Sequence, residues 1–308
     1  EGTDYTCVAS IIEQLRNDAV SKLFTAQSME KAWEKWHPFI TNLIGSPPQA
    51  DKIFDLGDHL RDIMFSAYVK IDKPTLSQTQ SMKSRSGALW ESLLAWYCNL
   101  CLIGTRSVVI KKSKSLVPSQ FLDAITADYG TQQEDSEADL IALTFPNNAD
   151  FTSAVDKISK KSLEKLVDEH FKDFELGVIS CKTPWNDFTV IPQHWNMVYN
   201  LAINNPDALE MKIGINDWDV TVLKKFFYAF ATLPSQKPEI IKSTSLPVVR
   251  LKKLSGGNFW GLSSKKGIAK SMKEIFKKNF SSSIGDGIES NLKKELPKLK
   301  TDYSYFGI

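Results

Sequence analysis

The chain has 308 residues, of which 42% are apolar and 24% charged, and its formal net charge is +2. This composition is typical of a folded globular protein and argues against long disordered regions. Cys98 and Cys101 form a CxxC pair inside an apolar run, without the second Cys or His pair that a zinc site needs. We therefore expect free thiols, a reducing compartment and a cytoplasmic location.

The predicted elements follow from apolar residues spaced three and four apart, which indicate helices, and from β-branched or apolar runs, which indicate strands. In chain order we expect helices at 6–45 and 52–69, a loop at 74–86, a helix at 87–102, a strand at 106–111, a short helix and an acidic loop within 118–138, a strand at 139–145, a helix at 151–173, a strand at 175–182, helices at 190–203 and 216–230, a connector at 234–247 and a helix at about 265–280.

These elements predict an α/β fold, with a central mixed β-sheet flanked by helices and with added helical regions at both ends. We divide the chain into an N-terminal helical region (1–85), a core (86–233) and a basic C-terminal region (234–308). The most apolar stretch, 88–104, contains Glu91 and Asn99 and is short for a bilayer span, so we expect a buried helix and no membrane contact.

Two predicted strands carry a candidate for chemistry. Side chains alternate across a sheet, so Ser180 and Lys182 share one face of the strand at 175–182. Asp139 begins the strand at 139–145, and if the two strands pair antiparallel, Asp139 and Lys182 meet at one edge of the sheet. A carboxylate there can hold Mg²⁺, and a lysine beside the metal can position water and stabilise charge on a phosphate. The simpler alternative is a strand-capping aspartate and an exposed strand-end lysine.

The order of these pieces resembles the core of the PD-(D/E)xK nucleases. A helix with a glutamate, an aspartate before an apolar strand, a strand ending in x-Lys and a further helix occur in SGALWESLLAWY (86–97), SEADLIALTF (136–145) and ELGVISCKTPWND (175–187). The last segment, followed by IPQHWNMVY (191–199), is similar to type II restriction endonucleases, including a subgroup that cuts GGNNCC. The resemblance covers about a third of the chain and implies a restriction-endonuclease-like core.

The resemblance also implies roles for single residues. Asp139 matches the metal-binding aspartate, Lys182 the catalytic lysine, and Glu91 the helix glutamate that assists the metal site. Ser180 stands where the family usually has Asp or Glu. Some members have Ser-x-Lys and recruit a glutamate from the next helix, but here that stretch offers Gln193 and Asn196. Glu91 and Asp139 then hold Mg²⁺ with help from Gln193 or a backbone carbonyl, or the site lacks its second acid.

The C-terminal region is strongly basic. Residues 250–300 carry 13 Lys and Arg against 4 acids, whereas residues 1–249 carry 25 against 31. Such asymmetry indicates a polyanionic partner, with a solvated lysine-rich helix as the alternative. Three- and four-residue spacing predicts that four lysines share a helix face and contact DNA phosphates, namely Lys266, Lys270, Lys273 and Lys277.

These observations together predict an Mg²⁺-dependent, sequence-specific endonuclease that cuts double-stranded DNA and acts as a homodimer, because two-fold protein symmetry matches a palindromic site. One rival is a DNA-binding or regulatory protein that keeps the nuclease fold without activity, which the serine at position 180 favours. Another is an interaction domain whose basic tail binds RNA or a membrane.

Overall fold

The computed structural model describes residues 9–66, 76–182, 187–205, 210–232, 242–261, 267–283 and 287–308. At 76–85, 114, 187–194, 196 and 247 it describes the backbone alone. The segments 67–75 and 183–186, which include part of the predicted 74–86 loop and the turn after Lys182, lie outside the described residues.

A mixed five-stranded sheet forms the centre of the protein. Its strands lie in the order β10 (Phe259–Trp260), β9 (Lys225–Thr232), β7 (Glu175–Lys182), β5 (Leu140–Thr144) and β2 (Ser107–Lys111). The strand β5 is antiparallel to both of its neighbours, β2 and β7, whereas β9 runs parallel to both β7 and β10. The prediction of an α/β fold with a central mixed sheet flanked by helices is confirmed.

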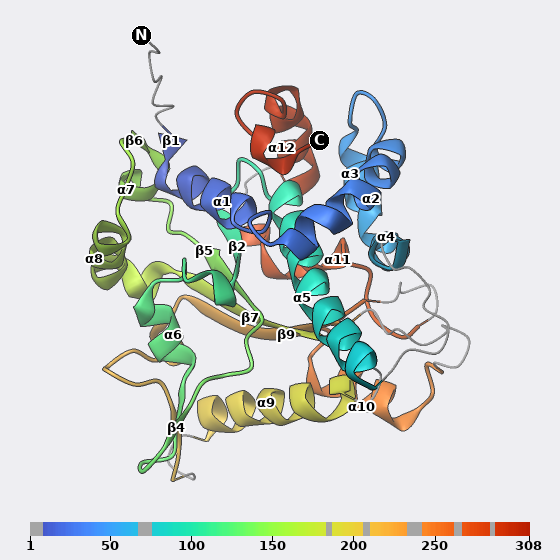
Figure 1. The fold of residues 1–308 in the computed structure, drawn as a ribbon. Helices are drawn as coiled ribbons and strands as arrows, with labels where there is room; N and C mark the ends of the chain where they lie inside the picture. Colours follow the sequence, from blue (N-terminus) through green and yellow to red (C-terminus); the bar gives the residue numbers. More distant parts are fainter. Residues whose placement is uncertain are drawn as a thin grey trace.

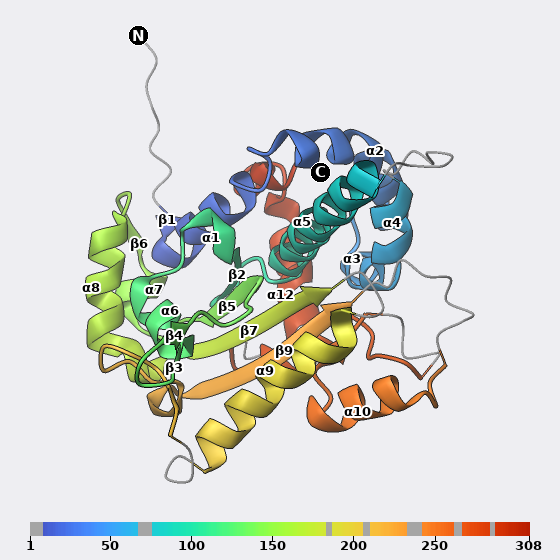
Figure 2. The same cartoon turned by 60° about the horizontal axis from the view of Figure 1, so that its bottom comes forward.

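Helices cover both faces of this sheet. One hydrophobic cluster joins the sheet to α2 (Gln27–Ile44), α3 (Ala50–Asp55), α4 (Leu60–Ser66), α5 (Leu76–Cys101), α11 (Glu274–Asn279) and α12 (Ile288–Glu295). The other joins the opposite face to α1 (Ile11–Ser21), α6 (Ser119–Ile125), α8 (Lys160–His170), α9 (Asp187–Asn204) and α10 (Leu246–Leu254). Figure 2 shows α5 and α9 on opposite sides of β7 and β9.

Elements from both ends of the chain pack around α5. Figure 1 shows α12 close to α3, and residues of both belong to the same hydrophobic cluster as α5. Trp96 of α5 is fully buried and donates a hydrogen bond from its indole Nε1 to the carbonyl of Phe306 at 3.1 Å. The N-terminal and C-terminal helical regions are therefore continuous with the core around this helix. No helix in the described part of the chain is long and apolar enough to cross a membrane.

Small strands lie outside the main sheet. β1 (Ala9–Ser10) pairs with β6 (Ala154–Val155) next to the short helix α7 (Ala149–Thr152). β3 (Ala127–Asp128) pairs with both β4 (Gln133–Glu134) and β8 (Lys212–Ile213). Apart from β1, which precedes the main strands in the chain, these small strands and the helices α7 and α8 lie in the connections between the main strands.

The free edge of β2 is closed by side chains. The buried Arg16 donates from Nη1 to the carbonyl of Ser107 and from Nη2 to that of Thr105, both at 2.8 Å. Asn99 of α5 donates from Nδ2 to the carbonyl of Val109 at 2.6 Å and accepts from the N–H of Val109 at 3.1 Å. Side chains of α1 and α5 thus bind the backbone groups that an edge strand usually leaves free.

The predicted helix at 216–230 is wrong. Its second half is the strand β9, preceded by a short 3₁₀ turn at Val220–Val222. Phe226, Tyr228 and Phe230 belong to one hydrophobic cluster and Phe227 to the other, so the strand presents apolar side chains to both faces. The periodicity of a short run that is apolar on both sides does not distinguish a buried strand from a buried helix. In the structure all of β9 pairs with β7, which makes it a strand.

Other boundaries also differ. The predicted helix at 6–45 is interrupted between α1 and α2, and the helix α5 begins at Leu76 within the predicted loop at 74–86. In a helix, each Ser, Thr or Gln residue is less favourable than Ala by only a few tenths of a kcal/mol. The helix that is buried at 88–101 can therefore continue back through this polar stretch to Leu76. The predicted helix at 265–280 is reduced to α11, since Gly267 has a φ of 63° and Lys270 forms an isolated β-bridge to β10.

Candidate active site

Asp139 and the carboxyl end of β7 meet at one end of the sheet. The strands β5 and β7 pair antiparallel with Leu140 opposite Ile179, and the N–H of Asp139 donates to the carbonyl of Ile179 at 3.2 Å. The predicted antiparallel pairing of these strands is therefore confirmed. It places Asp139 beside the last residues of β7.

The candidate residues also share a face. Ile141 of β5 and Val178 of β7 belong to the hydrophobic cluster that includes α9. Side chains two residues apart point the same way, so Asp139, Ser180 and Lys182 belong to that face. This is the arrangement that the alternation of residues predicted.

Asp139 is tied to the β7 backbone. Its Oδ2 accepts a hydrogen bond from the N–H of Cys181 at 2.5 Å. Burial raises the pKa of Asp139 to about 6, helped by the nearby carboxylates of Glu91 and Glu137 and opposed by Lys182 and the Cys181 N–H. The site is thus a place where an added positive charge is favoured, because such a charge relieves the burial of this carboxylate.

Lys182 forms an ion pair with a residue that the sequence did not single out. Its Nζ lies 2.9 Å from Oε1 of Glu137. Burial lowers the pKa of Lys182, but the charges of Asp139 and Glu137 outweigh burial, so the pKa is raised above its ordinary value. Lys182 is therefore a cation at neutral pH, suited to holding a phosphate or water oxygen and not to accepting a proton.

Glu137 could have been found from one signal. It lies two residues before Asp139, close enough along the chain to reach the same end of the sheet, although it stands in a tight turn where the Ala138 N–H donates to the carbonyl of Ser136. The acidic run around it, 134–137, resembles a solvated loop in the sequence. In the structure one of its carboxylate oxygens, Oε2, is buried and has no hydrogen-bond partner in the described part of the chain.

Glu91 lies on the α5 side of the sheet. Its Oε2 is 3.0 Å from Nζ of Lys111, the last residue of β2. The Lys111 ammonium also donates to the carbonyl of Ala88 at 2.9 Å and to Oγ of Ser92 at 3.3 Å. Glu91 is close enough to Asp139 to raise its pKa, yet its own charge is balanced by a buried lysine. The role of Glu91 as a metal ligand stays a prediction.

Three buried hydroxyl groups lie on the same face as the charged residues. Ser180, Tyr228 and Thr232 are each at most 6% exposed. The register pairs Lys182 with Thr232 and Val178 with Tyr228. The Ser180 hydroxyl lies beside the Tyr228 phenol, but none of the three oxygens has a partner in good hydrogen-bond geometry among the described residues. Unpaired buried oxygens of this kind are uncommon in folded proteins and indicate a polar ligand or water.

The donor set limits which metal the site can hold. Among the described residues, no group of three or more His, Cys, Asp or Glu side chains is placed to bind a metal ion. Mg²⁺ is commonly bound through only one or two carboxylates, with water and substrate phosphate completing its shell. The carboxylate of Asp139 and the unpaired buried Oε2 of Glu137 are hard oxygen donors and fit this ion.

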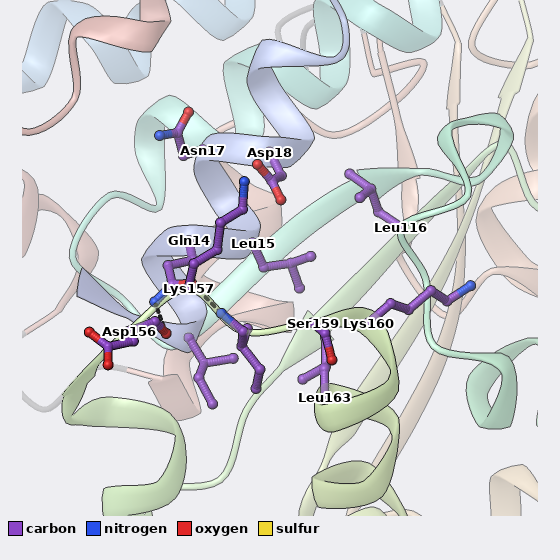
Figure 3. Close-up of a pocket in the computed structure, with 12 residues that line it drawn as sticks. Gln14, Leu15, Asn17, Asp18, Leu116, Asp156, Lys157, Ser159, Lys160 and Leu163 are labelled. Carbon is purple, nitrogen blue, oxygen red and sulfur yellow. Dashed lines mark hydrogen bonds between the residues drawn. The ribbon is translucent and has the colours of Figure 1, made fainter. Parts of the chain in front are cut away.

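A hollow elsewhere in the molecule contains none of the candidate residues. Figure 3 shows it between α1 and the segment that leads into α8, with Lys157 and Lys160 among its lining residues. Gln14 forms its wall, donating from Nε2 to the carbonyl of Val155 at 2.9 Å and accepting at Oε1 from the N–H of Ile158 at 3.0 Å. The side-chain amide of Gln14 therefore binds the backbone at 155–158 and holds α1 against this segment.

Some predicted DNA contacts fall outside what the structure describes. These are the side chains of Gln193 and Asn196 in α9 and the whole of Lys266. Their roles stay predictions.

The predicted shared helix face of the C-terminal lysines is wrong. Lys270 lies in the β-bridge to β10, Lys273 lies just before α11, and Lys277 lies within that helix. Their spacing does not place them on one face because Gly267 and the bridge interrupt the helix before α11. Lys273 also forms an ion pair with Asp55 at 2.6 Å. A role in DNA binding for Lys270, Lys273 and Lys277 stays a prediction.

The geometry of the β5–β7 end is the basis on which a function can be proposed. The chain matches no protein-family model, and no curated protein matches its sequence.

Proposed function

We propose that this protein is an Mg²⁺-dependent, sequence-specific endonuclease that hydrolyses phosphodiester bonds of double-stranded DNA and acts as a homodimer. The observation that carries the proposal is the meeting of Asp139 and Lys182 on one face of two antiparallel strands. The order of α5, the antiparallel strands β2, β5 and β7, and then α9 agrees with the restriction-endonuclease-like core implied by the sequence resemblance.

Each residue then has a physical task. Asp139 is fixed by the Cys181 N–H through Oδ2 and offers its carboxylate to the cation. An Mg²⁺ ion held there would supply Lewis-acid chemistry, polarising a phosphate for attack by water. Lys182 stays protonated and stabilises the negative charge that grows on the phosphate oxygens in the transition state. A lysine that is already charged and ion-paired in the free protein needs little reorganisation for this task.

The experiment is a plasmid digest in Mg²⁺ and in EDTA. The wild-type protein should cut at defined positions only with Mg²⁺. Lys182→Ala should abolish cutting and leave specific DNA binding nearly intact, because the lysine acts on the reacting phosphate and not on base edges. Lys160→Ala on α8, at an exposed side chain, is the matched control and should cut normally.

The second candidate is a DNA-binding protein that has the nuclease fold without activity. The uncharged Ser180 at the position of the usual acid favours it. Specific DNA binding with no Mg²⁺-dependent cutting by the wild-type protein would establish this candidate. Cutting that persists in Lys182→Ala would refute the proposed site.

A further inference from the structure

The strand β7 brings no carboxylate to the proposed site, because Ser180 stands where the resembled nucleases usually have Asp or Glu. A cation in it needs a second carboxylate beside Asp139, because Mg²⁺ is held in proteins by carboxylate oxygens, water and substrate phosphates. Ser180 is fully buried on the same face and carries an unpartnered hydroxyl, but it supplies no charge.

Glu137 is placed where this charge is missing. It reaches the end of β7 from the segment before β5 and contacts the ammonium of Lys182 at 2.9 Å through Oε1. Its side chain is 36% exposed, although the oxygen Oε2 is buried. One oxygen is thus bound to the lysine and the other is left without a protein partner.

Glu91 is less suited to the same task. Its carboxylate is paired with Lys111, which is itself buried and depends on Glu91 for its compensating charge. Moving Glu91 onto a metal would leave Lys111 uncompensated, which is costly for a buried cation. Glu137 can keep Lys182 on Oε1 while it offers Oε2.

We propose that Glu137 is the second metal-binding carboxylate of this site and replaces the acid that is absent at Ser180, so that one side chain joins the cation to Lys182. This inference rests on the proposed function for the identity of the cation, and it is tested without DNA.

The test is Mn²⁺ binding, followed by electron paramagnetic resonance and titration calorimetry. Glu137→Gln should weaken Mn²⁺ binding by about 10-fold or more, as expected for the loss of a charged ligand. Asp135→Asn is the matched control, because it removes a neighbouring carboxylate that is 78% exposed and pairs with Lys112, and it should bind Mn²⁺ like the wild type.

A counter-ion role for Glu137 is separated by repeating the substitution without the lysine. In Lys182→Gln, Glu137 no longer has an ammonium to balance, so Glu137→Gln should still weaken Mn²⁺ binding by about 10-fold if it is a ligand. Equal Mn²⁺ affinity of Lys182→Gln and the double variant would overturn the inference, as would a wild-type protein that binds no Mn²⁺. Lys182→Met with and without Glu137→Gln repeats the comparison if the glutamine background fails to fold.

The endonuclease proposal and the Glu137 proposal fail with different experimental results. A wild-type protein that does not cut DNA, but whose Mn²⁺ affinity falls with Glu137→Gln in both backgrounds, refutes the endonuclease and supports the metal ligand. A protein that cuts DNA with unchanged Mn²⁺ affinity in Glu137→Gln supports the endonuclease and refutes Glu137.

Discussion

Asp139→Asn should make the metal-free protein more stable at neutral pH. The pKa of Asp139 is about 6 in the folded protein, against an ordinary value of 3.8 for an aspartate in water. The difference of roughly 2 units, at about 1.4 kcal/mol per unit, is worth ~3 kcal/mol. Because the folded-state pKa is raised, this stability is present below pH 4 and is lost as the pH rises through 6. Asparagine cannot ionise, so the variant avoids the loss.

The assay is thermal and urea unfolding in EDTA at pH 7.5 and pH 4, with Asp135→Asn as the exposed control. For 308 residues the entropy of unfolding is about 0.65 kcal/mol/K, so ~3 kcal/mol corresponds to about 5 °C in Tm at pH 7.5. The difference from the wild type should shrink to below about 1 kcal/mol at pH 4, where Asp139 is largely protonated in the folded protein.

Mg²⁺ should reverse the order of the two proteins. At 1,000 times its Kd, a bound ion stabilises the wild type by about 4.1 kcal/mol, which exceeds the ~3 kcal/mol advantage of the asparagine variant, and it stabilises that variant much less. An Asp139→Asn protein that is no more stable than the wild type at pH 7.5 in EDTA would refute the reasoning from burial.

Three further predictions concern the packing that holds the site. Asn99→Leu should cost about 2–5 kcal/mol in urea unfolding, because it leaves the buried N–H and carbonyl of Val109 unpaired; a loss below 1 kcal/mol would contradict this. Arg16→Met should cost about 3–5 kcal/mol by the same measurement, because it frees two edge carbonyls and an acidic partner, and a neutral effect would show that they are hydrated. Gly177→Ala should lower the Tm and cost about 1–3 kcal/mol, because a Cβ would lie 2.2 Å from the ring of Phe227; an unchanged Tm would mean that the ring moves freely.

The strands that form the candidate site could be predicted because their signals are local. The runs 139–145 and 175–182 are short and apolar, and each is bounded by polar or turn residues, which is enough to identify a buried strand. Alternation then placed Ser180 and Lys182 on one face without knowledge of the fold. The antiparallel pairing to Asp139 was a hypothesis that the structure confirms.

The missed features depend on contacts between distant parts of the chain. The run that forms β9 pairs with β7 along its whole length, and its apolar period alone does not distinguish it from a buried helix, although its aromatic residues favour a strand. The ion pair of Glu91 with Lys111 and that of Glu137 with Lys182 join segments 20 and 45 positions apart. The helix and strand periods in a sequence concern residues of one element, so they do not predict ion pairs between distant segments.

The closure of the β2 edge decides how copies of this protein can associate. Proteins with an open edge strand can extend one sheet across two subunits, since backbone groups of each copy find partners in the other. Here Arg16 and Asn99 already bind the outward carbonyl of Ser107 and both backbone groups of Val109. A dimer of the proposed kind therefore cannot extend the sheet through these backbone groups of β2. The same closure protects the edge from joining strands of partly folded chains, so concentrated solutions should resist aggregation through this strand.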